Sequence, residues 1–385
     1  MPGYELIGIE ELAEVTEVFS NGGILFRRGF DVLRNNCFKV KEFEDAFAAR
    51  MCSKHALAVT SGTAALRVAL AALNIMPGDE VITQSFTFVA TVEAIIEASA
   101  IPICAEIDDT LNMDPADLKN KISPKTKAVI VVHMLGVPAN LRLIKNICDQ
   151  HSIPLIEDTA WGCGGSLDGK PLGSWGAIGT FSFDFAKAMT TGEGGMVLTN
   201  DSPTHAKAAA WHDHGHENNP NFPRWEDTRS SSGFNYRMME LQGAVGLAQL
   251  AKLDTVIARQ RENLARIMDK INDLPGIKFR RIIDGAQPTA DALVFLVKNR
   301  QCAINCRNEL LNSGLSTKIL PEAYSWHFAG TWKHIPELVH ANGGNLENAF
   351  QQSRNILSRA VALPISVKME TEIPTRVRNA LNKVL

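Results

Sequence analysis

The chain lacks any apolar run long enough to span a bilayer. It also lacks a signal-peptide pattern, because the N-terminal sequence MPGYELIGIEELAEV carries acidic residues early and has no basic region followed by an apolar core. The 39 Lys and Arg residues nearly balance the 42 Asp and Glu residues, and runs of like charge are short. Charge therefore gives no reason to expect nucleic acid or an anionic membrane as a partner. We expect a soluble, cytoplasmic protein.

Paired cysteines are lacking as well. The seven cysteines are odd in number, scattered and without a CxxC pair, which favours reduced thiols in the cytoplasm. One segment has to be considered as a metal site, because His212, His214 and His216 alternate in WHDHGHE and alternate positions of an extended segment share a face. No cysteine or acidic cluster completes such a site, so we predict no metal.

The length of the chain exceeds the usual size of a single hydrophobic core. It has 385 residues, of which 45% are hydrophobic and 21% are charged, so it can bury a large core and divides most naturally into two domains. We expect residues 1–250 to form a large ligand-binding domain that includes the N-terminal segment. We expect residues 251–385 to form a small C-terminal domain together with a bridging helix.

Short β-rich runs alternate with helical runs between residues 56 and 200. The expected strands cover residues 80–83, a run near 103, 128–133, 153–158, 178–183 and 195–199, and the expected helices cover 63–73, 89–98 and 141–150. This alternation predicts an α/β fold with a mostly parallel sheet between helices.

The second half of the chain has a different pattern. Residues 241–271 predict one long helix, which Pro275 and Gly276 close. Beyond it we expect strands over 277–282 and 292–297 and helices over 303–311 and 349–362, which would form a smaller α+β unit. Residues 217–232 are the most loop-like segment.

Lys187 is the residue with the strongest chemical context. In FSFDFAKAMTTGEGG it follows an apolar strand and precedes a glycine-rich turn, whereas an isolated lysine would be read as a surface residue. A lysine amine becomes a nucleophile in a partly dry pocket that lowers its pKa, which is what a Schiff-base site needs. Ser182, shortly before it, is a candidate ligand for a phosphate oxygen, and Gly194 and Gly195 permit close backbone approach.

Two upstream segments supply the groups that would hold a carbonyl cofactor. In TSGTAAL, Gly62 and Thr63 open an apolar helix, where free N–H groups and the helix dipole favour a phosphate, although ordinary capped helices begin in the same way. Asp158 ends a strand and is either a helix N-cap or the anion that keeps a pyridine nitrogen protonated. Phe88 is either a core aromatic or a stacking platform for a flat ring. Together these segments predict pyridoxal 5'-phosphate as cofactor.

The motifs SGTAAL, SFTFVAT, IEDTA, FSF followed by a lysine, GEGG, FNYRM and LPIS occur in this order. In combination they resemble the DegT/DnrJ/EryC1/StrS family of sugar aminotransferases over nearly the whole chain. The resemblance implies the aspartate-aminotransferase fold, fold type I, with a large domain and a small C-terminal α+β domain. It also implies that Lys187 binds the cofactor covalently, that Asp158 pairs with the pyridine nitrogen and that Phe88 stacks on the ring.

The same resemblance assigns the phosphate site and the assembly. It implies Gly62, Thr63 and Ser182 at the phosphate of the cofactor. It further implies that Asn235 reaches the phosphate of the neighbouring subunit's cofactor, so that the active unit is a homodimer. One position departs from the family pattern, because Trp161 stands where a glutamine or histidine usually hydrogen-bonds the ring hydroxyl of the cofactor. An indole donates one hydrogen bond and accepts none, so Trp161 is carried over only as a residue near the cofactor.

Three further segments bear on the substrate. MPGYELIG, FRRGF and WHFAGTWKHI resemble the branch that aminates the terminal carbon of an eight-carbon acidic sugar, the 8-amino-3,8-dideoxy-octulosonate transaminases. This branch implies a Kdo-type substrate and a role in lipopolysaccharide synthesis. Arg27, Arg28 and His327 are candidates for binding a substrate carboxylate, although such residues are more often surface or capping groups.

The function expected from these observations is a pyridoxal-phosphate-dependent aminotransferase that converts a keto or aldehydo sugar to an amino sugar, with glutamate as donor. A nucleotide-linked keto sugar is an alternative substrate. A sugar dehydratase on the same fold is a second alternative, but such enzymes resemble this family with a histidine at the lysine position, so Lys187 argues against it. A non-catalytic regulator is a third, because a fold alone never establishes activity.

Overall fold

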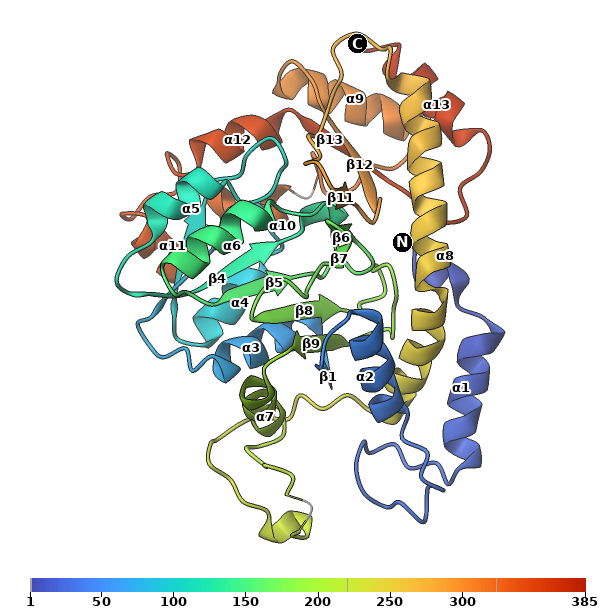
Figure 1. The fold of residues 1–385 in the computed structure, drawn as a ribbon. Helices are drawn as coiled ribbons and strands as arrows, with labels where there is room; N and C mark the ends of the chain where they lie inside the picture. Colours follow the sequence, from blue (N-terminus) through green and yellow to red (C-terminus); the bar gives the residue numbers. More distant parts are fainter. Residues whose placement is uncertain (1, 220, 323) are drawn as a thin grey trace.

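The fold is a three-layer α/β arrangement, seen in a computed structural model that describes residues 2–219, 221–322 and 324–385 (Figure 1). A seven-stranded sheet has the order β1-β9-β8-β5-β4-β2-β3. Its strands are β1 (His55–Val59), β2 (Glu80–Gln84), β3 (Ile101–Ala105), β4 (Thr126–Val132), β5 (Leu155–Asp158), β8 (Ile178–Ser182) and β9 (Gly195–Thr199). The strands from β8 to β3 run parallel, and β9 is antiparallel to both of its neighbours, β1 and β8. The expected mostly parallel sheet is confirmed.

Helices cover both faces of this sheet. Those of the first half are α1 (Ile9–Ser20), α2 (Lys39–Arg50), α3 (Gly62–Ala72), α4 (Ala90–Glu97), α5 (Pro115–Lys121), α6 (Leu141–Gln150) and α7 (Ser202–Trp211). One core cluster packs α3, α4 and α7 against one face, and another packs α5 and α6 against the opposite face (Figure 1). Because both faces are covered, the strands are buried along nearly their whole length rather than at alternate positions.

The C-terminal part adds a smaller sheet and a long helix. Helix α8 (Glu240–Ile271) runs along the side of the molecule and is followed by α9 (Arg300–Asn312), α10 (Tyr324–His327), α11 (Pro336–Ala341), α12 (Gln351–Ser358) and α13 (Ile373–Leu381) (Figure 1). Strands β10 (Lys278–Phe279), β12 (Ala292–Leu296) and β13 (Ala360–Pro364) form a three-stranded antiparallel sheet. Strands β6 (Ser166–Leu167), β7 (Lys170–Pro171) and β11 (Ala286–Gln287) form another. Short 3-10 helices cover Tyr4–Leu6, Met134–Gly136, Arg224–Glu226 and Ala329–Thr331. None of the helices in the described ranges combines the length and hydrophobicity needed to cross a membrane.

Two of the expected C-terminal elements differ in the structure. The helix expected over 349–362 ends with α12 at Ser358, and the apolar run after it is strand β13. Pairing with β12 decides this, because long-range backbone hydrogen bonds override a local pattern that suits either state. The strand expected over 277–282 is reduced to the two residues of β10. The loop-like segment 217–232, of which residue 220 lies outside the described residues, is mostly irregular.

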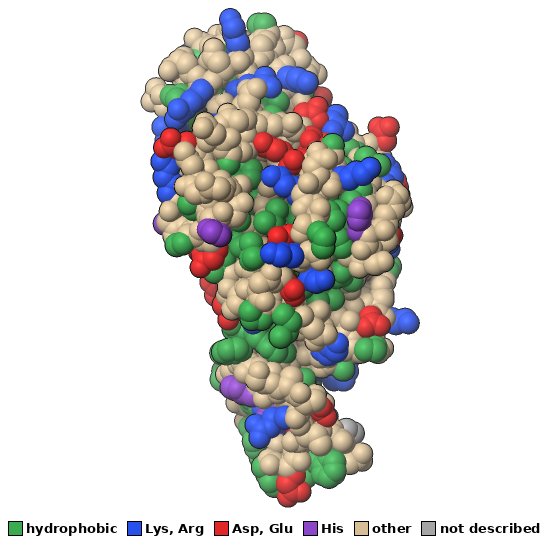
Figure 2. Space-filling view, turned by 90° about the vertical axis from the view of Figure 1, so that its left-hand side faces the viewer, with side chains coloured by type: hydrophobic (Ala, Val, Ile, Leu, Met, Phe, Trp, Pro, Cys, Tyr) green, Lys and Arg blue, Asp and Glu red, His purple; other side chains and the backbone are tan. Residues whose placement is uncertain are grey.

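The irregular segment projects from the body of the molecule. Figure 2 shows it as the lobe at the lower end, and blue and red side chains are interspersed over the face in view. Asp213 is fully buried at the base of the lobe and pairs with Arg224 and Arg237. These two guanidinium groups lower the pKa of Asp213, so the segment is anchored by a charged contact that persists over the usual pH range.

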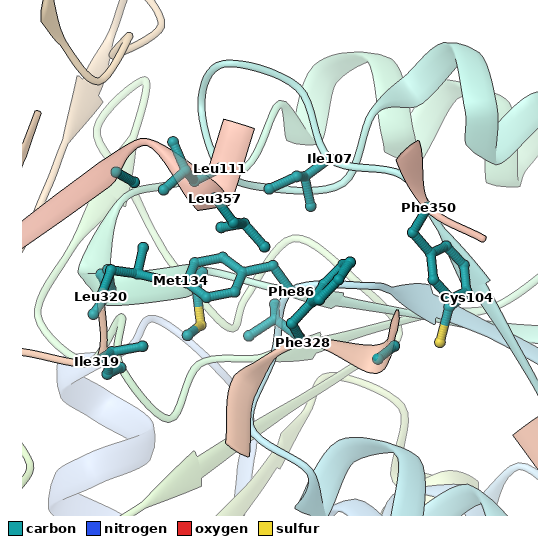
Figure 3. Close-up of a cluster of buried hydrophobic side chains, with 14 of the residues drawn as sticks. Phe86, Cys104, Ile107, Leu111, Met134, Ile319, Leu320, Phe328, Phe350 and Leu357 are labelled. Atoms are coloured by element: carbon teal, nitrogen blue, oxygen red, sulfur yellow. The ribbon is translucent and has the colours of Figure 1, made fainter. Parts of the chain in front are cut away.

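A shared hydrophobic core joins the two halves of the chain. Figure 3 shows Phe86 and Met134, which follow strands of the large sheet, beside Leu320, Phe328 and other side chains of the C-terminal part. The predicted boundary between residues 250 and 251 falls inside α8. The shared core matters for function, because it holds the segment that contains α10 against the end of the large sheet.

Candidate active site

A cavity of about 340 Å³ lies at the carboxyl ends of β5 and β8 and at the N-terminus of α3. Ligands bind at this edge in open α/β sheets, because the loops there leave a crevice between helices on opposite faces. The cavity brings together most of the residues predicted from sequence: Gly62, Thr63, Phe88, Asp158, Trp161, Ser182, Lys187 and His327. It is also lined by Ser61, Thr87, Thr91, Ala160, Thr180, Asp184 and Glu193.

Lys187 lies in the turn after β8, with its side chain partly buried in the cavity. The turn is held by Asp184, whose carbonyl accepts the backbone N–H of Lys187 at 3.0 Å and whose carboxylate accepts that of Ala186 at 3.0 Å. Burial lowers the pKa of Lys187 to about 8, although Asp291 and Asp184 act in the opposite direction. A substantial fraction of the amine is therefore neutral near pH 8, which is the state that attacks a carbonyl.

Asp158 ends β5 and is only 5% exposed. One carboxylate oxygen accepts the hydroxyl of Thr91 at 2.9 Å, and the other accepts the N–H of Ala160 at 3.1 Å. Burial raises the pKa of Asp158, against the effect of these two donors. An anion buried in this way is stabilised most by a cationic partner, so the position suits a protonated ring nitrogen. Thr87 contacts the hydroxyl of Thr91 at 2.8 Å and orients it.

Glu157, beside Asp158, points to the opposite side of the strand and fastens it. Its carboxylate accepts the backbone N–H groups of Gly173, Trp175 and Gly176 at 2.6–2.9 Å and contacts His133 Nε2 at 3.1 Å. The other ring nitrogen of His133 accepts the N–H of Ala139 at 3.1 Å. Nε2 therefore carries the ring proton and donates a hydrogen bond to Glu157. Both carboxylate oxygens of Glu157 thus have hydrogen-bond partners. They hold the end of β5 in place, and this orients Asp158.

The N-terminus of α3 closes one end of the cavity. The hydroxyl of Ser61 caps the helix by accepting the N–H of Ala64 at 3.0 Å, and the first N–H groups, including those of Gly62 and Thr63, have no partner within the helix. A Cβ added to Gly62 would lie 2.7 Å from the Cβ of Ser182, so glycine permits the close approach of α3 to β8. Helix N–H groups and a serine hydroxyl converge there, which is a phosphate-binding arrangement.

Aromatic side chains line the other end of the cavity. Phe88 is 42% exposed, so it is not a core aromatic, and it stacks on Trp326 with ring centroids 6.4 Å apart and planes 9° apart. His327 lies 5.4 Å from the Phe88 ring. Trp161 presents its indole to Lys187, whose Nζ lies 3.6 Å from the ring centroid. A flat ligand in this cavity would have an aromatic face available beside Asp158 and Lys187.

Three predicted residues lie outside the cavity. Arg27 is 7% exposed. Its guanidinium donates to the carboxylate of Glu44 at 2.6 Å and to the carbonyl of Ala58 at 2.9 Å. Its Nε is buried without a hydrogen-bond partner, and the substrate role of Arg27 stays a prediction. Arg28 lines a different cavity together with Arg27, and Asn235 is exposed beside Arg237.

Among the described residues, no group of three His, Cys, Asp or Glu side chains is arranged to hold a metal. His212 is buried against Arg27, and His216 contacts Asp227 at 3.3 Å. The histidines of WHDHGHE therefore have separate environments. All seven cysteines are free thiols.

Several residues at the site were missed in the sequence. Thr91 lies within SFTFVAT, one helical turn after Phe88, and this spacing could have suggested it as a neighbour of the cavity. No local sequence pattern indicates that Asp291 and Lys318 lie near the site, because they come close to Trp161 only through packing of the small sheet on the large one.

The site and fold together define a class of protein: a lysine amine, a buried carboxylate and a helix N-terminus converge at the end of a parallel sheet, as a pyridoxal-phosphate enzyme requires. Over residues 27–382 the chain matches the DegT/DnrJ/EryC1/StrS aminotransferase family. The chain belongs to this family. It is a pyridoxal-phosphate-dependent transaminase with the aspartate-aminotransferase fold, fold type I, as the sequence predicted.

Relatives and solved structures agree with this assignment. The chain is 32% identical to the spore coat polysaccharide biosynthesis protein SpsC of Bacillus subtilis (strain 168), over 99% of this chain and 95% of that protein. It is 38% identical to GDP-perosamine synthase of Vibrio cholerae, over 61% of this chain and 63% of that protein. The X-ray structure of the aminotransferase from Psychrobacter cryohalolentis superposes with a TM-score of 0.87 at 26% identity, covering 100% of this chain and 98% of that one. The chain is a sugar aminotransferase.

Proposed function

We propose that the protein aminates an oxo sugar with glutamate as donor, using Lys187 and Asp158 on a pyridoxal phosphate held in the 340 Å³ cavity. One observation carries the proposal: a lysine with a pKa lowered to about 8 and a buried carboxylate line the same cavity. The helix N-terminus at Gly62 and Thr63, together with Ser182, fits a phosphate group. Phe88 fits a ring-stacking role, because it is 42% exposed and lines the same cavity as Asp158.

Each residue then has a defined task. The cofactor, when bound, supplies an electron-withdrawing ring that stabilises negative charge at the carbon losing its proton. Asp158 keeps the ring nitrogen protonated through an ion pair, and Thr91 and Ala160 orient the carboxylate. Lys187 would hold the cofactor covalently. When not so engaged, its amine would accept and return the proton that moves between the two carbons of the exchange.

The substrate class is the finer part of the proposal. We propose an eight-carbon acidic sugar of the Kdo type, aminated at its terminal carbon for lipopolysaccharide synthesis in the cytoplasm. His327 supports this, because it lines the cavity and belongs to the segment WHFAGTW. A nucleotide-linked keto sugar is the alternative, and likeness to GDP-perosamine synthase supports it. Lys187 argues against a dehydratase, for which a histidine is expected at that position.

The experiment is an assay of the reconstituted protein with glutamate and three sugars: an 8-oxo Kdo-type acid, the matching neutral oxo sugar and a nucleotide-linked 4-keto sugar. We expect 2-oxoglutarate and an amino sugar in equal amounts, with the acidic sugar reacting at the highest kcat/KM. Preference for the nucleotide-linked sugar would overturn the substrate class and leave transamination intact. A sugar product that has lost water without gaining nitrogen would overturn transamination itself.

We also propose a homodimer in which each protomer completes the other's site. Asn235 supports this, because it is exposed and does not line the cavity of its own chain. Large apolar side chains are exposed along the N-terminal segment and beside Asn235, which is the composition of a protein interface. They include Tyr4, Ile7, Ile9, Leu12, Phe19, Phe30, Val32, Leu33, Phe234 and Met239.

Mixed dimers test the shared site. Asn235→Ala is expected to weaken cofactor binding by about 10-fold to 100-fold, because a hydrogen bond to a charged phosphate is lost. Mixed with the inactive Lys187→Ala variant under limiting cofactor, it should regain about a quarter of the wild-type sites, since half of the dimers are mixed and each mixed dimer has one intact site. If Asn235 acts on the cofactor of its own chain, both sites of a mixed dimer are defective and no activity returns.

A further inference from the structure

We propose that Trp161, Asp291 and Lys318 act as positioning residues that hold the Lys187 amine and control how readily it takes up a proton. The inference rests on the proposed function of Lys187 as the amine that attacks the cofactor and transfers the proton. The three residues meet because Trp161 packs against the core cluster that joins β12 of the small sheet to the large sheet.

Trp161 is the contact surface for the amine. Its indole has the Nζ of Lys187 at 3.6 Å and the Nζ of Lys318 at 4.8 Å from the ring centroid. The face of an indole attracts an ammonium group, and the attraction grows where water is excluded. An indole cannot accept a hydrogen bond in the way that a histidine or glutamine can. At this position the chain therefore offers Lys187 a cation-binding face.

Asp291 and Lys318 form a buried pair on the small-sheet side. Lys318 Nζ lies 2.6 Å from each carboxylate oxygen of Asp291, which is 4% exposed. Asp291 precedes β12 and its carbonyl accepts the N–H of Ile365, while the N–H of Lys318 donates to the carbonyl of Ala362. Backbone hydrogen bonds from the region of β13 therefore fix both partners, so the pair is a rigid feature and not a surface contact.

A close approach of the backbones brings this pair to Trp161. The N–H of Thr289 donates to the carbonyl of Gly136 at 3.0 Å, and its hydroxyl donates to the carbonyl of Trp161 at 3.3 Å. A Cβ on Gly136 would lie 1.9 Å from the Thr289 hydroxyl oxygen, and Gly136 has a φ of +75°. A glycine is therefore required there for residues 289–291 to dock on Trp161.

Several charges act on Lys187 from the elements around it. Asp291 and Asp184 favour its charged form most, Lys318 opposes it and Asp158 favours it, while burial lowers its pKa to about 8. Glu193 and His327 line the same cavity. Loss of the Asp291 charge leaves the Lys318 cation uncompensated, which makes the Lys187 ammonium less stable and lowers the pKa of Lys187. Loss of the Lys318 charge leaves the Asp291 anion uncompensated, which makes the Lys187 ammonium more stable and raises that pKa.

Competitive labelling measures this on the full-length protein without cofactor. Trace acetic anhydride is applied from pH 6 to 11, and acetylation of Lys187 is followed by peptide mass spectrometry. In the wild type we expect the midpoint near pH 8, with labelling lost at lower pH as the amine becomes protonated. Asp291→Asn should move the midpoint down and Lys318→Met should move it up, each by about one pH unit. Removing both charges in the double variant should return it close to the wild-type value.

The opposite directions separate this role from a structural one. Loosened packing would hydrate Lys187 and shift every variant upward toward the ordinary lysine value, so a downward shift in Asp291→Asn has no such explanation. Trp161→Leu should also move the midpoint down, whereas Trp161→Phe, which keeps an aromatic face, should stay closer to the wild type. Lys333→Met is the matched control, because it breaks an exposed ion pair with Glu347 and should change nothing.

Each outcome decides the inference. Shifts in the same direction for Asp291→Asn and Lys318→Met, or no shift in either, would overturn it. If Asp291→Asn does not fold, Trp161→Leu decides, since the inference lowers its midpoint whereas loosened packing would raise it, and an unchanged or raised midpoint contradicts the inference. Labelling requires neither substrate nor cofactor, so a wild-type midpoint near 8 with the expected shifts would stand even if the sugar assay failed. The pH profile of kcat in the reconstituted enzyme should shift in the same directions.

Discussion

Lys187→Ala is expected to abolish transamination, lowering kcat by at least about 10⁴-fold. In the proposed function the amine of Lys187 both holds the cofactor and moves the proton, and no other lysine lines the cavity in the described part of the chain. The measurement is the initial rate of 2-oxoglutarate formation with glutamate and the preferred sugar. Borohydride reduction followed by peptide mass spectrometry should find the cofactor attached to Lys187 in the wild type and unattached in the variant.

Fold and charge controls make this result specific. Lys207→Ala removes an exposed lysine of α7 and should leave the rate unchanged. Lys187→Arg keeps a cation in the cavity but not a nucleophile, so it should be as inactive as the alanine variant. Thermal unfolding should show that Lys187→Ala is folded, because a cation held with a lowered pKa does not contribute stability below about pH 8. A Lys187→Ala protein with the wild-type rate would contradict the assignment.

Asp158→Asn is expected to lower kcat by about 10²-fold to 10³-fold, the size of effect seen when one preorganised charge or donor at a developing charge is removed. Asparagine keeps the shape and can still contact Thr91 and the N–H of Ala160, but it has no charge to hold the ring nitrogen protonated. The ring then withdraws electrons less strongly, so the step that removes a proton from carbon slows. Single-turnover rates with glutamate alone would report this step directly.

Two variants calibrate the Asp158 result. Thr91→Val removes one hydrogen bond to the carboxylate and keeps its charge, so its effect should be several-fold and far smaller than that of Asp158→Asn. Asp168→Asn removes an exposed carboxylate that pairs with Arg142 and should have no effect on the rate. An Asp158→Asn enzyme that removes the glutamate proton as fast as the wild type would exclude the ion pair with the ring nitrogen.

Most of the large sheet could be predicted from sequence, because its strands are short apolar runs separated by amphipathic helices, and both patterns are local. The C-terminal part was less predictable. Residues 360–364 suit a helix or a strand equally well, and only pairing with β12 decides between them. The loop-like character of 217–232 was visible in its composition, but its anchor at buried Asp213 was not.

At the site, the sequence identified those residues whose neighbours along the chain have chemistry related to their own. Asp158 ends β5, Gly62 begins α3 and Lys187 lies in the turn after β8, all at the same edge of the sheet, so the topology of a parallel sheet implies that they meet. Arg27 shows what such reasoning leaves out, because nothing in its sequence context indicates the buried ion pair that it forms with Glu44. Lys318 and Asp291 show the reverse limit, since they become neighbours of Lys187 only by packing.

By itself the sequence determined the class of fold, the lysine and aspartate of the site and, through the order of its motifs, the family. Those properties depend on residue type, local pattern and the connectivity of βα units, all of which are written along the chain. Only the tertiary structure decided which cations and carboxylates form ion pairs, how the Trp161 indole is oriented and which charges act on Lys187. These depend on burial and on distances between residues far apart in sequence, and the strength of a charge interaction changes steeply with both.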